Sequence, residues 1–337
     1  MIDQAADDNF LQVTNISKTD ERSIVLQDIS LTIPRYKKLA IAGETGSGKS
    51  TLLKIIAGLS QPDSGRVHFC NERVVGPDWK LIPGHPGIAY LSQYFELQNF
   101  LKVRQVLGYA NTLTDEAASE LFVICRIDHL LDRRTDELSG GEKQRIAMAR
   151  LLITAPKLLL LDEPFSNTDM VHKTLLKSVI KDISDQLNIT CMLISHDPLD
   201  VLSWADEILV LRNGKIVQQG TPQEIYQQPH DEYTGGLFGK YNLITPATAA
   251  LFPEMRHLVH DDKPIFMRPE KFKITTAHTG LRSVVSAGQT TEGTVEDVLF
   301  LGSSADVIVT LGEQSVIVKT TDLRFKKGDR VFIGLAG

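Results

Sequence analysis

The sequence predicts an α/β domain followed by a small all-β domain, and three observations support this prediction. A glycine-rich turn at residues 43–48 stands between an apolar strand and a helical segment, as at the start of a β–α–β unit. Further short apolar runs alternate with helical segments as far as residue 242. After that residue, segments of alternating apolar and polar residues are typical of an antiparallel β domain. We therefore expect domains at 1–242 and 243–337.

The segments of the first domain follow one another in the order that this fold class requires. Residues 10–42 contain short strands, and a helix with apolar residues at helical spacing is expected over 50–59. A strand at 88–91 precedes a mostly helical stretch, which we place at about 94–138 as a helical subdomain. The remaining segments are a helix at 144–153, a strand at 158–161, a helix at 171–186, a strand at 191–194, a short helix at 199–204 and a strand at 207–211.

The second domain contains hardly any helical periodicity. Its expected strands include residues 295–297, 306–311, 315–320 and 330–334, separated by glycines and polar turns. A barrel that closes its own edges would protect these short strands from pairing with other chains.

Composition excludes several classes of protein. Apolar residues make up 42% of the 337 residues and charged residues 23%, which is ordinary for a folded chain. A net charge of −6 argues against nucleic acid as a partner. The three cysteines are scattered, so neither a disulfide framework nor a zinc site is expected. We expect no signal peptide, and no apolar run is long enough to cross a bilayer.

The string GETGSGKST at residues 43–51 predicts a phosphate-binding loop. Nucleotide phosphates need a wrap of backbone N–H donors that side chains would obstruct, and the following helix directs its positive end at the anion. The lysine would reach the β/γ oxygens, and the serine after it would offer its hydroxyl to Mg²⁺. The residues of this predicted site are Gly43, Glu44, Thr45, Gly46, Ser47, Gly48, Lys49, Ser50 and Thr51.

The string KLLLLDEP at residues 157–164 predicts a buried strand with two carboxylates at its carboxyl end. In a doubly wound sheet, ligands bind at that end. Asp162 would hold the Mg²⁺ shell, and Glu163 would orient or deprotonate the attacking water.

The string LSGGEKQR at residues 138–145 predicts a second helix N-terminus with exposed amides. Its candidate anion-binding residues are Ser139, Gly140, Gly141 and Glu142. Because the first loop already serves one nucleotide, the second helix end is expected to serve a nucleotide held by another copy.

Two polar residues follow further strands. A lone histidine is more often structural than functional, but His196 follows the strand at 191–194, beside the other candidate residues, which favours a contact with the γ-phosphate. Gln93 follows the strand at 88–91, and taken alone its amide is more often a surface group than a ligand.

These motifs stand in the order found in the ATP-binding-cassette ATPases, which residues 10–242 resemble. The resemblance implies ATP and Mg²⁺ as cofactors, with Ser50, Gln93 and Asp162 at the metal. It further implies that Gln93 senses the transporter, that residues 139–142 clamp the partner's ATP, and that His196 contacts the γ-phosphate. Asp169, in the string SNTD at 166–169, would cross the dimer interface.

The end of the chain resembles one subgroup of this family. The strings GTPQEIYQQP, LFGKYN and FMRPEKFKI are similar to the ATPase subunits of bacterial uptake systems for sugars, polyamines, ferric iron or sulfate. The resemblance implies a C-terminal oligosaccharide-binding-type barrel, called TOBE, which GTVEDVLFLGSSADVIV at 293–309 fits. It also implies a homodimer, or a dimer with a close paralogue, on the cytoplasmic face of the membrane. Permease subunits, and indirectly a periplasmic solute-binding protein, would be partners.

Two residues depart from the family pattern, and one alternative stays open. Asp20 stands where the family usually has an aromatic residue that stacks on adenine, and Thr168 where an aliphatic residue is common. A soluble ATPase with a ligand-sensing tail, not coupled to transport, is the alternative. An ABC protein that acts on DNA or ribosomes is disfavoured, because the chain has neither a coiled-coil insertion nor a second cassette. The sequence does not identify the solute.

Overall fold

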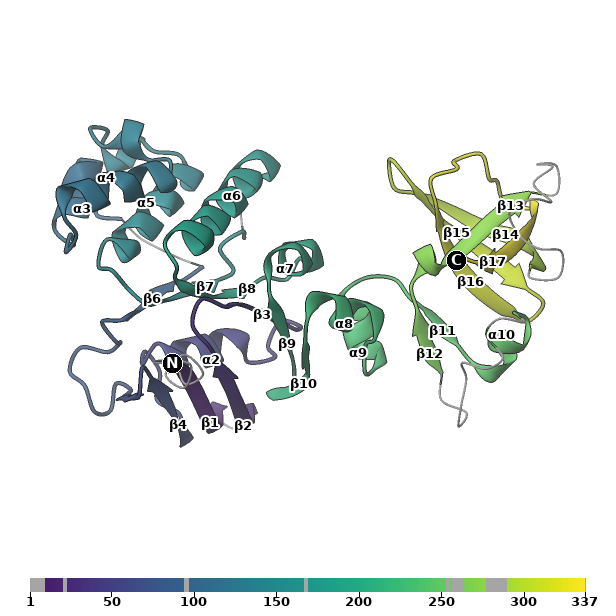
Figure 1. Ribbon diagram of the computed structural model, residues 1–337, viewed down its shortest axis with the longest axis horizontal. Coiled ribbons are helices and arrows are strands. Elements are labelled where there is room, and N and C mark those ends of the chain that lie inside the picture. The colour runs from purple at the N-terminus through teal and green to yellow at the C-terminus, as the bar shows by residue number, and fades with distance from the viewer. Residues whose placement is uncertain are drawn as a thin grey trace, which may run out of the picture. The chain divides into compact units, whose positions relative to one another are not determined.

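A six-stranded sheet forms the centre of the first part of the chain in the computed structural model (Figure 1). Its strand order is β10-β9-β3-β8-β7-β6, with β9 and β10 antiparallel and the other neighbours parallel. The strands are β3 (Lys38–Ala42), β6 (Ile88–Leu91), β7 (Leu158–Asp162), β8 (Thr190–Ile194), β9 (Glu207–Arg212) and β10 (Lys215–Gly220). This sheet is the doubly wound arrangement expected from the alternation of strands and helices.

The structure describes residues 10–20, 23–93, 97–166, 169–252, 255, 264–276 and 290–336. Contacts divide the chain into a unit at Met1–Ile225 and a unit at Tyr226–Gly337. The division falls before the predicted boundary at 242, because residues between Tyr226 and Lys240 are bonded to Arg268. Its guanidinium donates to the carbonyls of Tyr226, Gly235, Gly239 and Lys240 at 2.7–3.1 Å. The domain limits 1–242 and 243–337 stay a prediction.

Each face of the central sheet is covered by a separate apolar core. Leu158 and Leu160 of β7 pack on one face with helix α2 (Lys49–Ile56) and an antiparallel sheet of order β2-β1-β4-β5. Leu159 and Leu161 pack on the opposite face with the helices. This alternation explains why β7 is apolar along its whole length. The antiparallel strands are β1 (Leu11–Asp20), β2 (Ser23–Ile33), β4 (Ser64–Phe69) and β5 (Glu72–Val74).

The helices on the second face include the predicted helical subdomain. Its described elements are α3 (Val103–Gly108), α4 (Asp115–Ile124) and the 3₁₀ turns η1 (Asp128–Leu130) and η2 (Thr135–Glu137). Residues 94–96 of the prediction lie outside the described residues. Two longer helices, α5 (Gly140–Leu152) and α6 (Met170–Gln186), lie beside these elements (Figure 1) and share the same apolar core. Helix α7 (Pro198–Trp204) follows β8. Helix α5 begins four residues before the predicted start at 144, because Ser139 caps it.

The second unit is built on a five-stranded antiparallel sheet that forms a half-barrel. The strand order is β13-β17-β14-β15-β16, with β13 (Phe272–Thr276), β14 (Thr291–Phe300), β15 (Ala305–Leu311), β16 (Gln314–Thr320) and β17 (Arg330–Leu335). The all-β fold predicted here is confirmed. Its smaller elements are α9 (Glu232–Leu237), β11 (Asn242–Ile244), α10 (Pro246–Ala250), β12 (Ile265–Met267) and η4 (Pro269–Lys271), and α8 (Pro222–Gln227) spans the division between the units.

The helices and cysteines of the described residues bear on two expectations from the sequence. Among them, no helix is both long and apolar enough to span a bilayer. All three cysteines are free thiols. Burial raises the pKa of both Cys125 and Cys191 to about 12, so these two are protonated core residues at neutral pH.

Candidate functional site

The carboxyl ends of four parallel strands bring most of the predicted site residues to one edge of the central sheet. Strands β3 and β8 pair Ile41 with Ile194, and β8 pairs Ile194 with Asp162 of β7. The phosphate loop follows β3, and His196 follows β8. Gln93 comes two residues after Leu91 of β6, which pairs with Leu161 of β7. The sheet therefore aligns segments that are distant in the sequence.

The phosphate loop depends on glycines with positive φ angles. Gly43, Gly46 and Gly48 have φ of 152°, 83° and 101°. A Cβ on Gly48 would lie 2.5 Å from the carbonyl oxygen of Val25, whereas a Cβ on Gly46 would have no atom within 4 Å. Both positions need glycine for conformation, but only Gly48 also needs it for space.

Lys49 points back over the loop that precedes it. Its ammonium donates to the carbonyl oxygens of Gly43 and Glu44 at 2.8 and 2.7 Å, and the residue is only 6% exposed. Burial lowers the pKa of Lys49, and the nearby carboxylates of Glu163 and Asp162 oppose that shift. A desolvated cation held over a loop of backbone amides suits an anionic ligand such as a polyphosphate.

Ser50 and Asp162 are joined directly. The Ser50 hydroxyl donates to Asp162 Oδ1 at 2.8 Å, and the Tyr90 hydroxyl donates to Asp162 Oδ2 at 2.7 Å. Burial, together with the hydrogen bond to this carboxylate, raises the pKa of Tyr90. Both oxygens of Asp162 are thereby fixed. Tyr90 was missed in the sequence, where it is one of four residues of a short buried strand and gives no separate signal.

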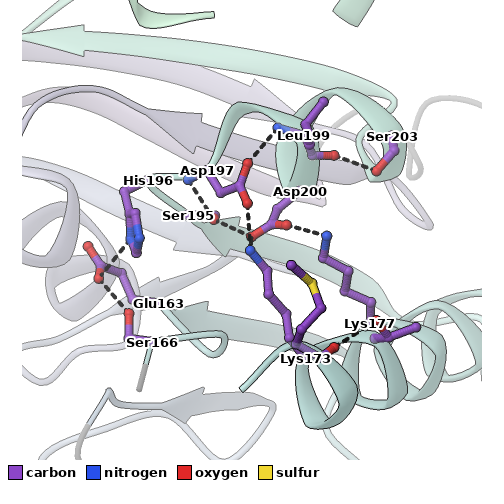
Figure 2. A network of polar contacts seen from close by, with 12 residues as sticks. Glu163, Ser166, Lys173, Lys177, Ser195, His196, Asp197, Leu199, Asp200 and Ser203 are labelled. Atoms are coloured by element: carbon purple, nitrogen blue, oxygen red, sulfur yellow. Dashed lines mark hydrogen bonds and ion pairs between the residues drawn. The ribbon is translucent and has the colours of Figure 1, made fainter. Parts of the chain in front are cut away.

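Glu163 directly follows β7 and lies beside His196 and Ser166 (Figure 2). Its backbone has a φ of 48° and its N–H donates to the carbonyl of Ile194 at 3.1 Å. Its carboxylate accepts a hydrogen bond from Ser166 at 2.8 Å and lies 3.5 Å from His196 Nδ1. The two residues predicted to act on water and on the γ-phosphate are therefore neighbours, and Ser166 is a further neighbour that the sequence did not reveal.

The predicted second anion site is the N-terminus of α5. Ser139 Oγ accepts from Glu142 N at 3.3 Å, while Glu142 accepts from Ser139 N at 2.8 Å, which makes a capping box. The amides of Gly140 and Gly141 lie in the first turn. Gln144 of the same helix donates to the carbonyl of Pro164, which links α5 to the segment after β7.

Asp169 occupies the N-terminus of the next helix. It caps α6 by accepting from His172 N at 2.9 Å, and its other oxygen lies 2.7 Å from His172 Nδ1. A Cβ on Gly141 would lie 2.8 Å from the His172 ring, so the first turns of α5 and α6 are in close contact. Thr168, predicted in the same motif, lies outside the described residues.

The predicted residues thus form two groups. The first group follows β3, β7 and β8, where Ser50 bonds to Asp162 and Glu163 lies beside His196. Gln93 lies at the same edge of the sheet, after β6. Ser139 and Asp169 belong to the helix ends of α5 and α6. Lys49 and Ser50 bond to Gly43, Glu44 and Asp162, whereas Ser139 and Glu142 bond to each other. The phosphate loop and the second helix end, the two predicted anion sites, therefore belong to different groups of contacts within one chain.

Comparison with known proteins identifies both parts of the chain. The ABC transporter family model matches residues 26–166, and the TOBE domain model matches residues 265–337. A sulfate/thiosulfate import ATP-binding protein, CysA of Synechocystis sp., is 32% identical over 95% of this chain and 92% of its own length. A spermidine/putrescine import ATP-binding protein, PotA of Nitratidesulfovibrio vulgaris, is 31% identical over 92% of this chain and 88% of its own.

Solved structures resemble about two thirds of the chain. CbiO1 from Clostridium perfringens, part of the ABC transporter complex cbiONQ, matches with a TM-score of 0.56 and 29% identity, over 65% of this chain and 90% of its own. An ATP-binding cassette of an ABC transporter in its ADP conformation matches with a TM-score of 0.55 and 25% identity, over 65% of this chain and 95% of its own. The prediction of a nucleotide-binding cassette is confirmed.

Proposed function

The chain belongs to the ABC transporter family as the ATP-binding subunit of a solute importer, and we propose that it hydrolyses ATP as one half of a dimer whose closure drives permease subunits. Each nucleotide would lie between the phosphate loop of one copy and the helix α5 N-terminus of the other. The partner is a second copy of this chain or a close paralogue.

The observation that carries this proposal is that the two predicted anion sites belong to different groups of contacts within one chain. Lys49, Ser50 and Asp162 form one site, and Ser139 caps the helix end that forms the other. A second copy facing the first would complete both sites at once, as an isologous dimer does. ATP binding and dimer closure would then be linked free energies, so a monomer should hydrolyse ATP poorly.

Roles within one site follow from the chemistry of its atoms. Lys49 and the loop amides would hold the phosphates. The oxygens of the Ser50 hydroxyl and the Asp162 carboxylate lie 2.8 Å apart, and oxygen ligands of this kind fit Mg²⁺. Gln93 would be a third ligand. Bound Mg²⁺ supplies positive charge to the phosphate oxygens. Glu163 would orient or deprotonate water, His196 would contact the γ-phosphate, and Asp169 would reach across the dimer interface.

The location and partners follow from the family. A cassette that drives permease subunits works at the cytoplasmic face of the membrane. The permease would take its solute from a periplasmic binding protein, which is thus an indirect partner of this chain. The relatives named above import solutes as different as sulfate and spermidine, so membership of the group assigns no solute to this chain. Nucleic acid has no place in this function.

Co-purification from membranes tests the coupling to transport. The chain should be retained with permease subunits encoded beside it, and its ATP hydrolysis should rise in that assembly. Lys49→Ala should still bind the permease but should not hydrolyse ATP. A chain that hydrolyses ATP equally well alone, and that never co-purifies with permease, would support the uncoupled alternative instead.

A further inference from the structure

Two lysines and two aspartates connect helix α6 to the turn that carries His196 (Figure 2). Lys173 lies 2.5 Å from Asp197 Oδ2 and 3.1 Å from Asp200 Oδ2. Lys177, one helical turn further along, contacts Asp200 Oδ1. The Asp200 side chain is 0% exposed, so its charge is balanced entirely by groups within the protein.

The same network holds both neighbours of His196. Ser195 Oγ donates to Asp200 Oδ2 at 2.9 Å and accepts from Asp197 N at 3.2 Å. Asp197 also caps α7, because its Oδ1 accepts from Leu199 N at 3.0 Å. The backbone on either side of His196 is therefore fixed, while the imidazole itself is 68% exposed and faces Glu163.

Lys173 itself belongs to the first turn of α6. Its backbone N–H bonds to the carbonyl of Asp169, the residue that caps the helix. Burial disfavours the charge of Lys173, but the hydrogen bonds that its ammonium donates to Asp197 and Asp200 outweigh burial and raise the pKa. The ammonium is thus a charged link between the α6 N-terminus and the His196 turn at neutral pH.

We propose that Lys173 is a positioning residue for ATP hydrolysis, which it serves by fixing the His196 turn against the first turn of α6. This inference rests on the proposed function. Lys173 does not touch the phosphate loop; it acts through Asp197 and Asp200. A partner copy that displaces Asp169 would move Lys173 with the helix and so shift His196, which gives the dimer interface a mechanical link to the γ-phosphate side of the site.

Replacing Lys173 tests this role in the full chain. Lys173→Met should lower kcat about tenfold or more, with KM for ATP changed less than about twofold, because a misplaced His196 affects the reacting phosphate and not the phosphate loop. Lys173→Arg keeps the charge and should recover most of the rate. Lys181→Met is the matched control, since Lys181 lies on the same helix, is exposed and forms an ion pair with Asp185 rather than with Asp197 or Asp200.

A double-mutant cycle separates ion pairing from helix capping. Asn caps helices as Asp does, so Asp197→Asn removes the charge and keeps the cap. If Lys173 acts through Asp197, the double variant should be about as slow as Lys173→Met alone. The proposal would be overturned if the two substitutions lowered kcat by independent factors that multiply in the double variant. It would also be overturned if Lys173→Met kept the wild-type kcat.

Hydrogen exchange of the nucleotide-free chain gives a reading that does not need activity. Lys173→Met should speed exchange at residues 195–199 and leave the last turns of α6 unchanged, with Lys181→Met showing neither effect. Unchanged exchange at the His196 turn would overturn the inference even in an active enzyme. A wild-type chain without ATPase activity, combined with the expected exchange pattern, would count against the proposed function and leave this link standing.

Discussion

The Nδ1 atom of His196 lies 3.5 Å from Oε2 of Glu163, and the two residues come from the ends of neighbouring strands. A carboxylate held beside an imidazole in this way can accept a proton from water. The backbone of Glu163 has a left-handed φ of 48°, which non-glycine residues rarely adopt and which is concentrated at functional sites.

Glu163→Gln should separate ATP binding from hydrolysis. Glutamine keeps the shape and can still accept from Ser166, but it is not a base. We expect hydrolysis to fall about 10²-fold or more while ATP affinity is retained, so that the nucleotide stays trapped in a dimer. Steady-state turnover with the transporter partner present and a binding titration measure both quantities. Turnover near the wild-type rate would show that another group is the base.

Ser139→Arg should prevent dimer closure without affecting the phosphate loop of the same copy. The arginine would fill the space where the other copy's γ-phosphate is expected, at the α5 N-terminus. In a Glu163→Gln background, ATP should no longer produce a dimer in size-exclusion chromatography, whereas nucleotide affinity of the monomer should stay the same. A dimer that persists in this variant contradicts the composite-site model.

Gly48→Ala should destabilise the first unit more than Gly46→Ala. Each alanine would carry the conformational cost of a positive φ, about 1–3 kcal/mol. Only the Gly48 variant adds a clash, because its Cβ would lie 2.5 Å from the Val25 carbonyl oxygen. Urea unfolding of the two variants measures the difference in the free energy of unfolding. Equal losses would mean that the β2 strand moves aside at little cost.

Asp197 should make stability fall in acid. Burial alone would raise its pKa, but the hydrogen bonds from Lys173 and from Leu199 N–H outweigh burial and bring the pKa below the ordinary value of 3.8. A carboxyl with a depressed native pKa stabilises the fold above its unfolded pKa, and that contribution is lost as the pH falls through the native value. Wild type should therefore be more stable than Asp197→Asn at pH 7, and this gap in melting temperature should narrow below about pH 4. A gap independent of pH would refute the ion pair.

The sequence predicted the elements of the site better than the contacts that hold them. Local patterns such as 43–51 and 138–145 carry their own geometry, because glycines and a capping serine act on adjacent backbone. The bond from Tyr90 to Asp162 and the pairing of Lys173 with Asp197 join residues from different elements. No spacing rule reaches across elements, so only the folded chain could reveal them.

Asp20, at the position where the family usually has an adenine-stacking aromatic residue, is the clearest departure from the family pattern. Two nearby aromatic residues are the candidates to replace it. Phe10 is 2% exposed and packs edge-on against Phe69 with ring centroids 5.0 Å apart, so it is fixed in the core. Tyr36 is 57% exposed, but its N–H bonds to Thr190 at the start of β8, at the sheet edge opposite the phosphate loop. Neither ring can therefore stack on adenine in place of the aromatic residue that the family has at position 20.

Nucleotide affinity should then rest on contacts with the phosphates, which ATP and GTP share. We expect the purified chain to bind GTP within about fivefold of ATP, or about 1 kcal/mol. Asp20→Tyr should tighten both nucleotides, since stacking of a base on an aromatic side chain is worth about 1–3 kcal/mol. Titration of the wild type and of Asp20→Tyr with both nucleotides measures these effects. A preference of the wild type for ATP above about thirtyfold, or about 2 kcal/mol, would mean that another residue of the chain reads the adenine.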